Sequence, residues 1–121
     1  MSKNLISMKK ISIIVPVLNE AENINSFIKE LNKYDEIFNY EVIFCTDPSK
    51  DGTEELLLKL SKNNPKKYKA LIMSRKFGQN ACILAGLENM SGDAAIIIDV
   101  DGQDPVSLIP NFIQKGEEGY M

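Results

Sequence analysis

Residues 94–105 read AAIIIDVDGQDP, an apolar run long enough for a buried strand that ends abruptly in carboxylates. Asp99 and Asp101 stand two positions apart, and Gln103 follows at the same spacing. At the carboxyl end of a parallel strand, these side chains would meet solvent where open α/β sheets bind ligands. Carboxylate and amide oxygens are hard ligands, which favours Mg²⁺ or Mn²⁺ over a soft metal. A cation held there would in turn carry a diphosphate.

Three further apolar runs predict strands at residues 11–15, 42–45 and 70–73, and the fourth strand is expected at residues 94–98. Between the strands, apolar residues recur at helical spacing. The predicted helical stripes are Ile24, Phe27, Ile28 and Leu31; Leu56, Leu57 and Leu60; Ala81, Leu84, Ala85 and Leu87; and Ile109, Phe112 and Ile113. Strands that alternate with helices predict an α/β fold, a mostly parallel sheet flanked by helices with right-handed crossovers.

The helix ends carry signals of their own. Capped helix starts are predicted at Asn19 with Glu22, at Asp51 with Glu54, and at Asp104 with Pro105. Helix ends are predicted at Asn64-Pro65 and at Ser91-Gly92. A loop therefore follows each predicted strand and opens a helix.

The chain has 121 residues, which fits a single domain over residues 1–121. A four-stranded sheet of this kind would leave an edge uncovered, so we expect a truncated, amino-terminal portion of a larger domain and self-association through the free edge. The net charge is −3 and the cations are scattered, so nucleic acid is not expected as a partner.

Two residue types narrow the chemistry. Cys45 and Cys82 are the only cysteines, and their apolar neighbours predict small buried hydrophobes in a reducing compartment. The absence of histidine excludes Ser-His and Cys-His nucleophile pairs and the usual histidine zinc sites. No apolar run approaches the length of a membrane span and residues 1–10 lack the apolar stretch of a signal peptide, so a cytoplasmic location is expected.

Polar side chains follow the first two predicted strands. After the first, Pro16 would shape a turn and Glu20 would accept hydrogen bonds from a base or ribose, although a simple cap at Asn19 explains this loop better when it is taken alone. After the second, Asp47 would pair with the N–H donors of a nucleobase, or equally serve as a turn residue.

The loop after the third strand, residues 74–80, carries Arg75, Lys76 and Gly78 before a helix start. Two cations and a glycine at that place would approach a phosphate, or equally form a solvated turn. The acidic loop after the fourth strand is different, because the adjacent carboxylates of Asp99 and Asp101 repel one another unless a cation or donor neutralises them. All four loops face the same side of the sheet by topology, and together they indicate a nucleotide sugar.

Five motifs in order carry a resemblance to a known family. They are residues 13–20 (IIVPVLNE), 47–53 (DPSKDGT), 74–78 (SRKFG), 92–93 (GD) and 99–105 (DVDGQDP). From about Ile11 to its end the chain resembles family 2 glycosyltransferases, and among them the polyprenyl-phosphate sugar transferases, which include dolichyl-phosphate mannose synthase and the bactoprenol glucosyltransferases. It departs from them at Thr46, Pro48 and Gly102, where the family commonly has an acid, a glycine and a larger apolar residue.

The resemblance implies a GT-A, Rossmann-like nucleotide-sugar-binding domain. The implied binding residues are Pro16, Leu18, Glu20, Asp47, Arg75, Asp99 and Val100 for the nucleotide sugar, and Asp99, Asp101 and Gln103 for Mg²⁺ or Mn²⁺, with Asp101 catalytic. The implied reaction is an inverting, metal-dependent transfer of a hexose from a UDP- or GDP-linked sugar to a polyprenyl phosphate. The full-length protein would work at the cytoplasmic face of a membrane.

Two other classes remain open at this point. A truncated, non-catalytic nucleotide-binding fragment or regulatory module would keep the donor site without transfer. A phosphoacceptor receiver domain has a similar length and alternation of elements, but it needs an acidic pair after the first strand and an acceptor aspartate after the third. Those loops offer Asn19-Glu20 and Ser74-Arg75 instead, so this class is disfavoured.

Overall fold

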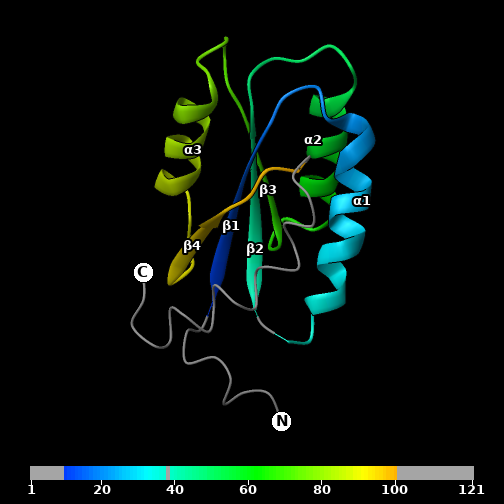
Figure 1. Cartoon of the computed structure of the whole chain (residues 1–121), viewed down its shortest axis with the longest axis vertical. Helices are drawn as coiled ribbons and strands as arrows, with labels where there is room; N and C mark the ends of the chain where they lie inside the picture. Colours follow the sequence, from blue (N-terminus) through cyan, green and yellow to red (C-terminus); the bar gives the residue numbers. More distant parts are fainter. Residues whose placement is uncertain (1–9, 38, 101–121) are drawn as a thin grey trace.

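The computed structural model describes residues 10–37 and 39–100. Its strands are β1 (Ile11–Val17), β2 (Tyr40–Thr46), β3 (Tyr68–Ile72) and β4 (Ala94–Ile97). They form one parallel sheet in the order β3-β2-β1-β4 (Figure 1). The four predicted strands are thereby confirmed, with β1 and β2 each longer than their apolar runs indicated.

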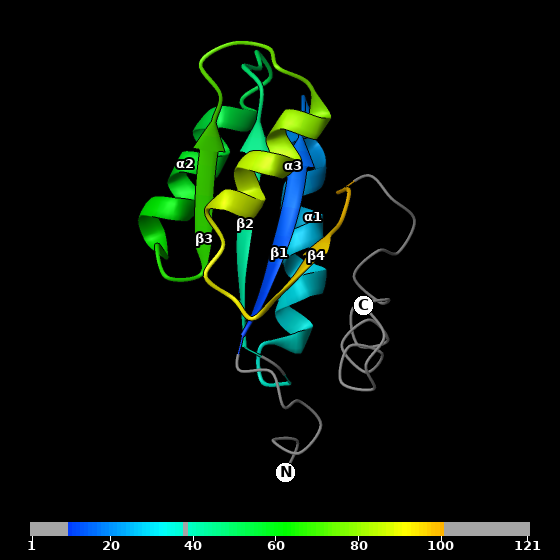
Figure 2. The ribbon, with the colours of Figure 1, turned by 90° about the vertical axis from the view of Figure 1, so that its left-hand side faces the viewer.

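Helices cover both faces of the sheet. The helices α1 (Ala21–Leu31) and α2 (Thr53–Asn63) lie on one face, and α3 (Gln79–Glu88) lies on the other (Figures 1 and 2). A short 3-10 turn, η2 (Asn32–Tyr34), follows α1. The chain moves outward from β1 to β3 and then returns past β1 to β4, so a right-handed crossover puts α3 opposite to α1 and α2. Within residues 10–37 and 39–100, no helix is long and apolar enough to cross a bilayer.

The main core lies between the sheet and the helices α1 and α2. All four residues of the predicted α1 stripe are buried, namely Ile24, Phe27, Ile28 and Leu31. The ring of Phe44 on β2 is fully buried and meets Phe27 edge-on at 6.2 Å and Tyr68 at 6.3 Å between centroids. Aromatic contacts of this kind stabilise the core beyond the burial of their area. The apolar stripe of α1 is the face of the helix that packs against the sheet, as the sequence predicted.

The predicted buried stripe of α3 is wrong. Leu84 is 60% exposed and Leu87 37% exposed, whereas Cys82 and Gly86 are buried against the sheet. A Cβ atom on Gly86 would lie 2.6 Å from Cγ2 of Ile14. The helix therefore approaches β1 so closely that only small side chains fit at the contact, and its leucines point elsewhere.

Pro16 lies inside β1 and not in the turn after it, which corrects the sequence-based expectation. In the ladder between β1 and β4, Ile98 N–H donates to the carbonyl of Ile14 at 3.0 Å. The next rung would need an N–H at residue 16 to reach the carbonyl of Ile98, and proline has none. Pro16 therefore ends the pairing of β1 with β4 at the rim of the sheet.

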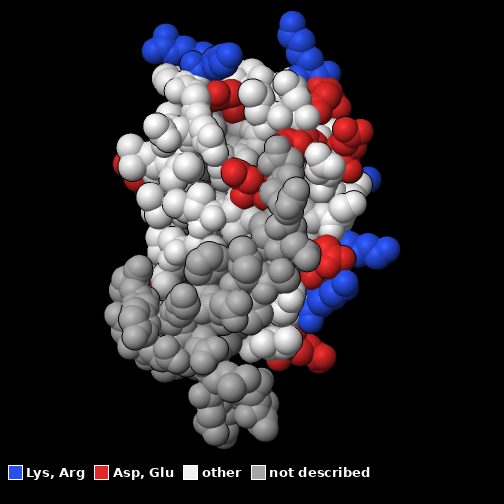
Figure 3. Space-filling view, viewed as in Figure 1, with Lys and Arg blue, Asp and Glu red and all other residues white. Residues whose placement is uncertain are grey.

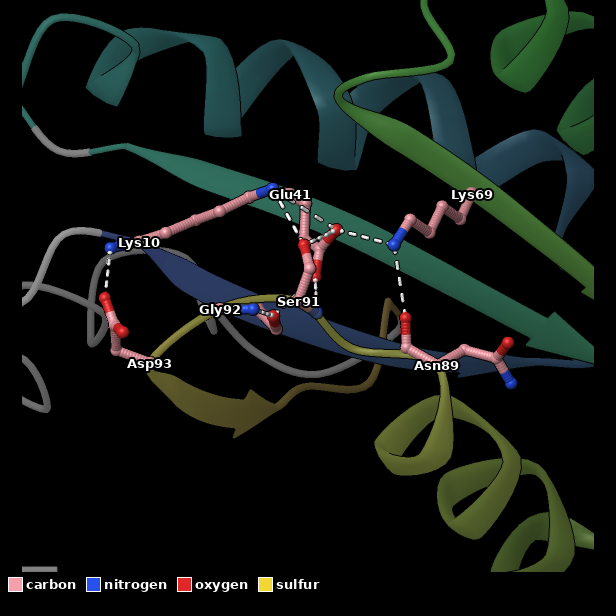
Figure 4. A network of polar contacts seen from close by, with 8 residues as sticks. Lys10, Glu41, Lys69, Asn89, Ser91, Gly92 and Asp93 are labelled. Carbon is pink, nitrogen blue, oxygen red and sulfur yellow. Dashed lines mark hydrogen bonds and ion pairs between the residues drawn. The ribbon is translucent and has the colours of Figure 1, made fainter.

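A buried carboxylate connects the strands at the opposite end of the sheet (Figure 4). Glu41 on β2 is fully buried and accepts hydrogen bonds from the Ser12 hydroxyl at 2.6 Å and from the Ser91 backbone N–H at 2.6 Å. Lys69 Nζ of β3 lies 3.0 Å from its other oxygen and Lys10 Nζ lies at 3.6 Å. Burial alone would raise the pKa of Glu41, but these bonds outweigh it and lower the pKa to about 2. No motif in the sequence predicted this cluster.

The segment between α3 and β4 also differs from its prediction. The helix ends at Glu88, so Ser91-Gly92 does not close it. Ser91 instead binds Glu41, and Gly92 N–H donates to the Ser12 hydroxyl at 2.8 Å. The predicted end of α2 near Asn64-Pro65 is confirmed, because the helix ends at Asn63. The fourth predicted helix and the Asp104 cap lie outside the described residues.

Candidate functional site

A pocket of about 380 Å³ opens at the carboxyl ends of the strands, next to the point where the strand order reverses between β1 and β4. This is the place where open α/β sheets bind ligands, and the volume lies within the range of small-molecule sites. Its lining residues are Pro16, Val17, Leu18, Glu20, Asp47, Lys76, Gly78, Gln79, Cys82 and Asp99. Segments far apart in sequence thus meet around one cavity.

One wall of the pocket is the segment between β1 and α1, residues 18–20, and its backbone is unusual. Asn19 adopts a left-handed conformation with φ 54°, so the predicted cap at this residue is wrong. Glu20 is the residue before the helix, and its side chain makes no capping bond to the helix backbone. Its Oε1 instead accepts a hydrogen bond from Asn23 Nδ2 at 2.9 Å. The kink at Asn19 leaves Leu18 47% exposed, and both Leu18 and Glu20 line the pocket.

The start of α1 is bonded from another helix. Ala21 N–H donates to Asp51 Oδ2 at 3.2 Å, and Glu20 N–H donates to Thr53 Oγ1 at 3.1 Å. Asp51 also accepts from the backbone N–H of Thr53 at 3.1 Å, while the cap position of α2 itself is Gly52, with φ 92°. The predicted cap at Asp51 is therefore displaced by one residue, and its carboxylate serves two helices.

Asp47 forms the floor of the pocket at the end of β2. It is 5% exposed, and its two oxygens accept from the backbone N–H groups of Phe77 at 3.0 Å and Gly78 at 2.9 Å. The hydrogen bond from Phe77, with that from Gly78, outweighs burial and holds the pKa of Asp47 below its ordinary value. The carboxylate is ionised at neutral pH and ties the loop after β3 to β2.

The loop after β3 places its two cations differently. Arg75 stacks its guanidinium over the ring of Phe77 at 5.0 Å and does not line the pocket, whereas Lys76 does. Gly78 holds φ 97° and ψ 168°, a backbone conformation open to glycine and unfavourable for other residues. Lysine and arginine side chains project from this end of the molecule (Figure 3). Lys50, in the loop between β2 and α2, is also exposed.

Asp99 is the part of the acidic turn that the structure describes. It is exposed, lines the pocket, and accepts a hydrogen bond from Gln79 Nε2 of α3 at 3.3 Å. Val100 packs into the core with 9% exposure and does not reach the pocket. Asp101 and Gln103 lie outside the described residues. Among residues 10–37 and 39–100 there is no group of three or more acidic or cysteine side chains that could hold a metal ion.

Cys45 and Cys82 are buried free thiols, as their apolar neighbours predicted. They face each other between β2 and α3, and Cys82 Sγ also lies 3.8 Å from Asp47 Oδ1. Burial raises the pKa of the Cys45 thiol to about 12. Burial also raises the pKa of Cys82. Both thiols are therefore protonated at neutral pH and act as small packing groups, with Cys82 in the wall of the pocket and Cys45 behind it.

The structure brings five of the predicted nucleotide-binding residues into one cavity. These are Pro16, Leu18, Glu20, Asp47 and Asp99. Arg75 and Val100 are not among the lining residues. Lys76 and Gly78, which were expected with Arg75 to approach a phosphate, do line the pocket, whereas Val17, Gln79 and Cys82 were not predicted as binding residues. The signal of these last three was position, since each lies in β1 or in the first turn of α3, next to a predicted site residue.

The family model of glycosyl transferase family 2 matches residues 12–120. The chain belongs to this family. The glycosyl transferase membership predicted from the five motifs is thus confirmed.

Two curated relatives place the chain within the family. It is 43% identical over 112 residues to a prophage bactoprenol glucosyl transferase homolog of Escherichia coli K12, covering 91% of this chain and 36% of that protein. It is 33% identical over 115 residues to the undecaprenyl-phosphate 4-deoxy-4-formamido-L-arabinose transferase of Salmonella choleraesuis, covering 93% of this chain and 35% of that protein. The chain spans about a third of the length of these family 2 relatives.

Among solved structures, a mannosyltransferase from Pyrobaculum calidifontis in complex with GDP-Man and Mn²⁺ matches with a TM-score of 0.71. The identity is 19%, and the match covers 88% of this chain and 32% of that one. A likeness at this identity shows a shared fold. The predicted GT-A, Rossmann-like fold of this family 2 chain is confirmed.

Proposed function

We propose that this chain is the donor-binding part of a glycosyltransferase that transfers a hexose from a UDP- or GDP-linked sugar to a polyprenyl phosphate. The observation that carries the proposal is the pocket at the carboxyl rim, which gathers Leu18, Glu20, Asp47 and Asp99 from three separate loops. The relatives named for bactoprenol and undecaprenyl phosphate support a lipid-phosphate acceptor.

The two ends of the pocket suit the two ends of a nucleotide. The β1 end offers the apolar side chains of Val17 and Leu18 with the carboxylate of Glu20, which would contact the base and ribose. The α3 end offers Lys76 and the amide of Gln79, which would face the diphosphate. Asp47 lies on the floor with both oxygens engaged by backbone N–H groups, so it would add to base recognition only through its remaining lone pairs.

The residues present fit a divalent cation. Asp99 offers an exposed carboxylate to the pocket, and Asp101 and Gln103 follow in the sequence as further oxygen donors. These three residues would hold Mg²⁺ or Mn²⁺, and the Pyrobaculum mannosyltransferase was solved with Mn²⁺. When bound, such a cation supplies positive charge against the negative charge that develops on the departing diphosphate.

The proposed transfer inverts the anomeric carbon. An oxygen of the acceptor phosphate forms a bond to that carbon as the bond to the donor diphosphate breaks, and the electron pair leaves with the nucleoside diphosphate. A phosphate monoester is already mostly ionised at neutral pH, because its second pKa is about 6. The acceptor would therefore not require a strong general base.

A nucleotide-binding module without transfer is the second candidate, because the residues of the described pocket are assigned to the nucleotide sugar alone. Isothermal titration with UDP or GDP and Mn²⁺, run beside a transfer assay with a polyprenyl phosphate, separates the two. Binding with transfer supports the enzyme, and binding alone supports the module. A cytoplasmic location and self-association through a sheet edge stay predictions, and a monomeric mass by light scattering would contradict the latter.

A thermal-shift screen of UDP and GDP, with and without Mn²⁺, tests the donor site directly. A ligand at about 100 times its Kd stabilises the folded state by about 2.7 kcal/mol, which is easily measured. We expect Asp101→Ala to abolish the part of the shift that depends on Mn²⁺, while the exposed control Glu30→Ala keeps it. If neither nucleotide shifts the wild-type melting temperature, the proposed donor site is wrong. If the shift of Asp101→Ala equals that of the wild type, the metal assignment alone is wrong.

A further inference from the structure

We infer that Asp51 and Thr53 are positioning residues of the donor pocket, which hold the wall that carries Leu18 and Glu20. The inference rests on the proposed function, because it takes the pocket to be the nucleotide site. Neither residue lines the pocket. Both act through the backbone at the start of α1, next to which the amino end of α2 lies (Figure 1).

The contacts form a closed set of hydrogen bonds between the two helix starts. The Thr53 hydroxyl accepts from Glu20 N–H at 3.1 Å and donates to Asp51 Oδ1. The same Asp51 oxygen accepts from Thr53 N–H at 3.1 Å, and Asp51 Oδ2 accepts from Ala21 N–H at 3.2 Å. Two of the N–H groups at the start of α1 are satisfied in this way by Thr53 of α2 and by Asp51 of the loop before it, and not by a side-chain cap within α1.

Within α1, the Glu20 carbonyl accepts from Asn23 N–H at 2.9 Å and its Oε1 accepts from Asn23 Nδ2 at 2.9 Å, so the bonds from Thr53 and Asp51 are the ones that tie this wall to the start of α2. Asn19 is a non-glycine residue with φ 54°, a left-handed conformation that asparagine tolerates better than most residues but that still costs free energy relative to an extended or helical backbone. Leu18 is 47% exposed and so gains little from packing. By contrast, Thr53 is fully buried and fixed by α2, which makes its hydroxyl a rigid anchor for the backbone of Glu20.

The electrostatics favour the same arrangement. The hydrogen bond from the Thr53 hydroxyl, helped by those from the backbone of Ala21 and Thr53, holds the pKa of Asp51 below its ordinary value. A carboxylate ionised at neutral pH also complements the positive ends of the α1 and α2 dipoles. Asp47 comes from the same loop and holds the opposite wall at Gly78. The loop between β2 and α2 therefore fixes both walls of the pocket.

A matched pair of substitutions at Thr53 separates positioning from general stability. Thr53→Val keeps the side-chain volume but removes the oxygen that accepts from Glu20 N–H. Thr53→Ser keeps the oxygen but removes the methyl group from a buried site. Each variant loses some stability, and only Thr53→Val releases the wall. Asp51→Ala and Asp51→Asn form a second pair, in which the asparagine retains one acceptor oxygen.

The first readout is the Kd for UDP and GDP by isothermal titration, at a temperature where circular dichroism shows every variant folded. We expect the Kd of the nucleotide that binds wild type to rise about tenfold in Thr53→Val and in Asp51→Ala, because each substitution removes one hydrogen bond to the wall, from Glu20 N–H or from Ala21 N–H. The Kd should change by less than about twofold in Thr53→Ser. The Kd of Asp51→Asn should lie between those of the wild type and Asp51→Ala. Equal Kd values for Thr53→Val and Thr53→Ser would overturn the inference.

The second readout needs no ligand. Amide hydrogen exchange at Glu20 and Ala21 should be slow in the wild type and in Thr53→Ser, and faster in Thr53→Val. Unchanged exchange in Thr53→Val would show that the wall is held by other contacts and would overturn the inference. Failure of the wild type to bind any nucleotide, with exchange behaving as expected, would instead refute the proposed donor site and leave the hold on the wall established.

Discussion

Replacing Glu41 by glutamine tests whether the buried carboxylate at the amino ends of the strands stabilises the sheet. The Glu41→Gln substitution keeps the shape of the side chain and removes its charge, so the ammonium groups of Lys69, at 3.0 Å, and Lys10, at 3.6 Å, lose their ionic partner. A pKa lowered from 4.5 to about 2 corresponds to about 3 kcal/mol in favour of the ionised form, at about 1.4 kcal/mol per pH unit. We therefore expect Glu41→Gln to lower the free energy of unfolding at pH 7 by about 3 kcal/mol.

The pH dependence follows from the direction of this change. Because the pKa of Glu41 is lower in the folded than in the unfolded chain, its contribution is complete above the unfolded value of about 4.5 and is lost as the pH falls toward about 2. The difference in stability between wild type and Glu41→Gln should be largest near pH 6 to 7 and should shrink steadily below pH 5. Urea unfolding followed by circular dichroism across this range measures it.

A control variant separates burial from charge as such. Glu30 pairs with Lys33 on the surface of α1 with half of its side chain exposed, so Glu30→Gln should cost less than about 0.5 kcal/mol. A Glu41→Gln protein within about 1 kcal/mol of the wild type at pH 7 would refute the reasoning. So would a stability difference that is the same at pH 3 and at pH 7, since that would assign the loss to packing.

Three further predictions concern close packing, backbone strain and the thiols. Gly92→Ala should destabilise the fold by about 1–3 kcal/mol in thermal melts, because the new Cβ would lie 2.6 Å from the Ser12 hydroxyl oxygen and 2.8 Å from its backbone nitrogen, and an unchanged Tm would contradict this. Gly78→Ala should cost about 1–2 kcal/mol through its φ of 97° alone, since no atom lies within 4 Å of the new Cβ, and urea unfolding measures this cost. Cys45 should react with a thiol reagent at pH 8 far more slowly in the native protein than in urea, because burial raises its pKa to about 12. Rapid labelling of the native protein would contradict this and show that the contact between β2 and α3 opens readily.

The parts of the fold that were predictable are those that short-range patterns encode. Four apolar runs gave four strands, and the stripe of Ile24, Phe27 and Leu31 gave the buried face of α1. In α3 the same reasoning failed, because the apolar residues of this helix are distributed almost evenly around its axis and do not define a single buried face. The close approach of Ile14 at Gly86 selected the small side chains for the contact, and that approach is a tertiary fact with no local signal.

The sequence predicted the location of the candidate site better than it predicted the contacts within it. Strand ends and loop composition correctly gathered residues such as Leu18 and Asp47, because parallel strands present their carboxyl ends at one rim. Which of two adjacent cations enters the pocket depends on the path of the loop, and Asp47 sets that path through bonds formed 30 residues away in sequence. The sequence cannot distinguish Lys76 from Arg75 for that reason.

Pro16 has one more effect on how this rim can be used. Because the nitrogen of Pro16 carries no hydrogen, β1 and β4 cannot form a further backbone hydrogen bond beyond Ile98, even where the two strands lie close together. An incoming molecule therefore need not break any main-chain bond there on entering. The pyrrolidine ring of Pro16 thus keeps this part of the rim open to a ligand.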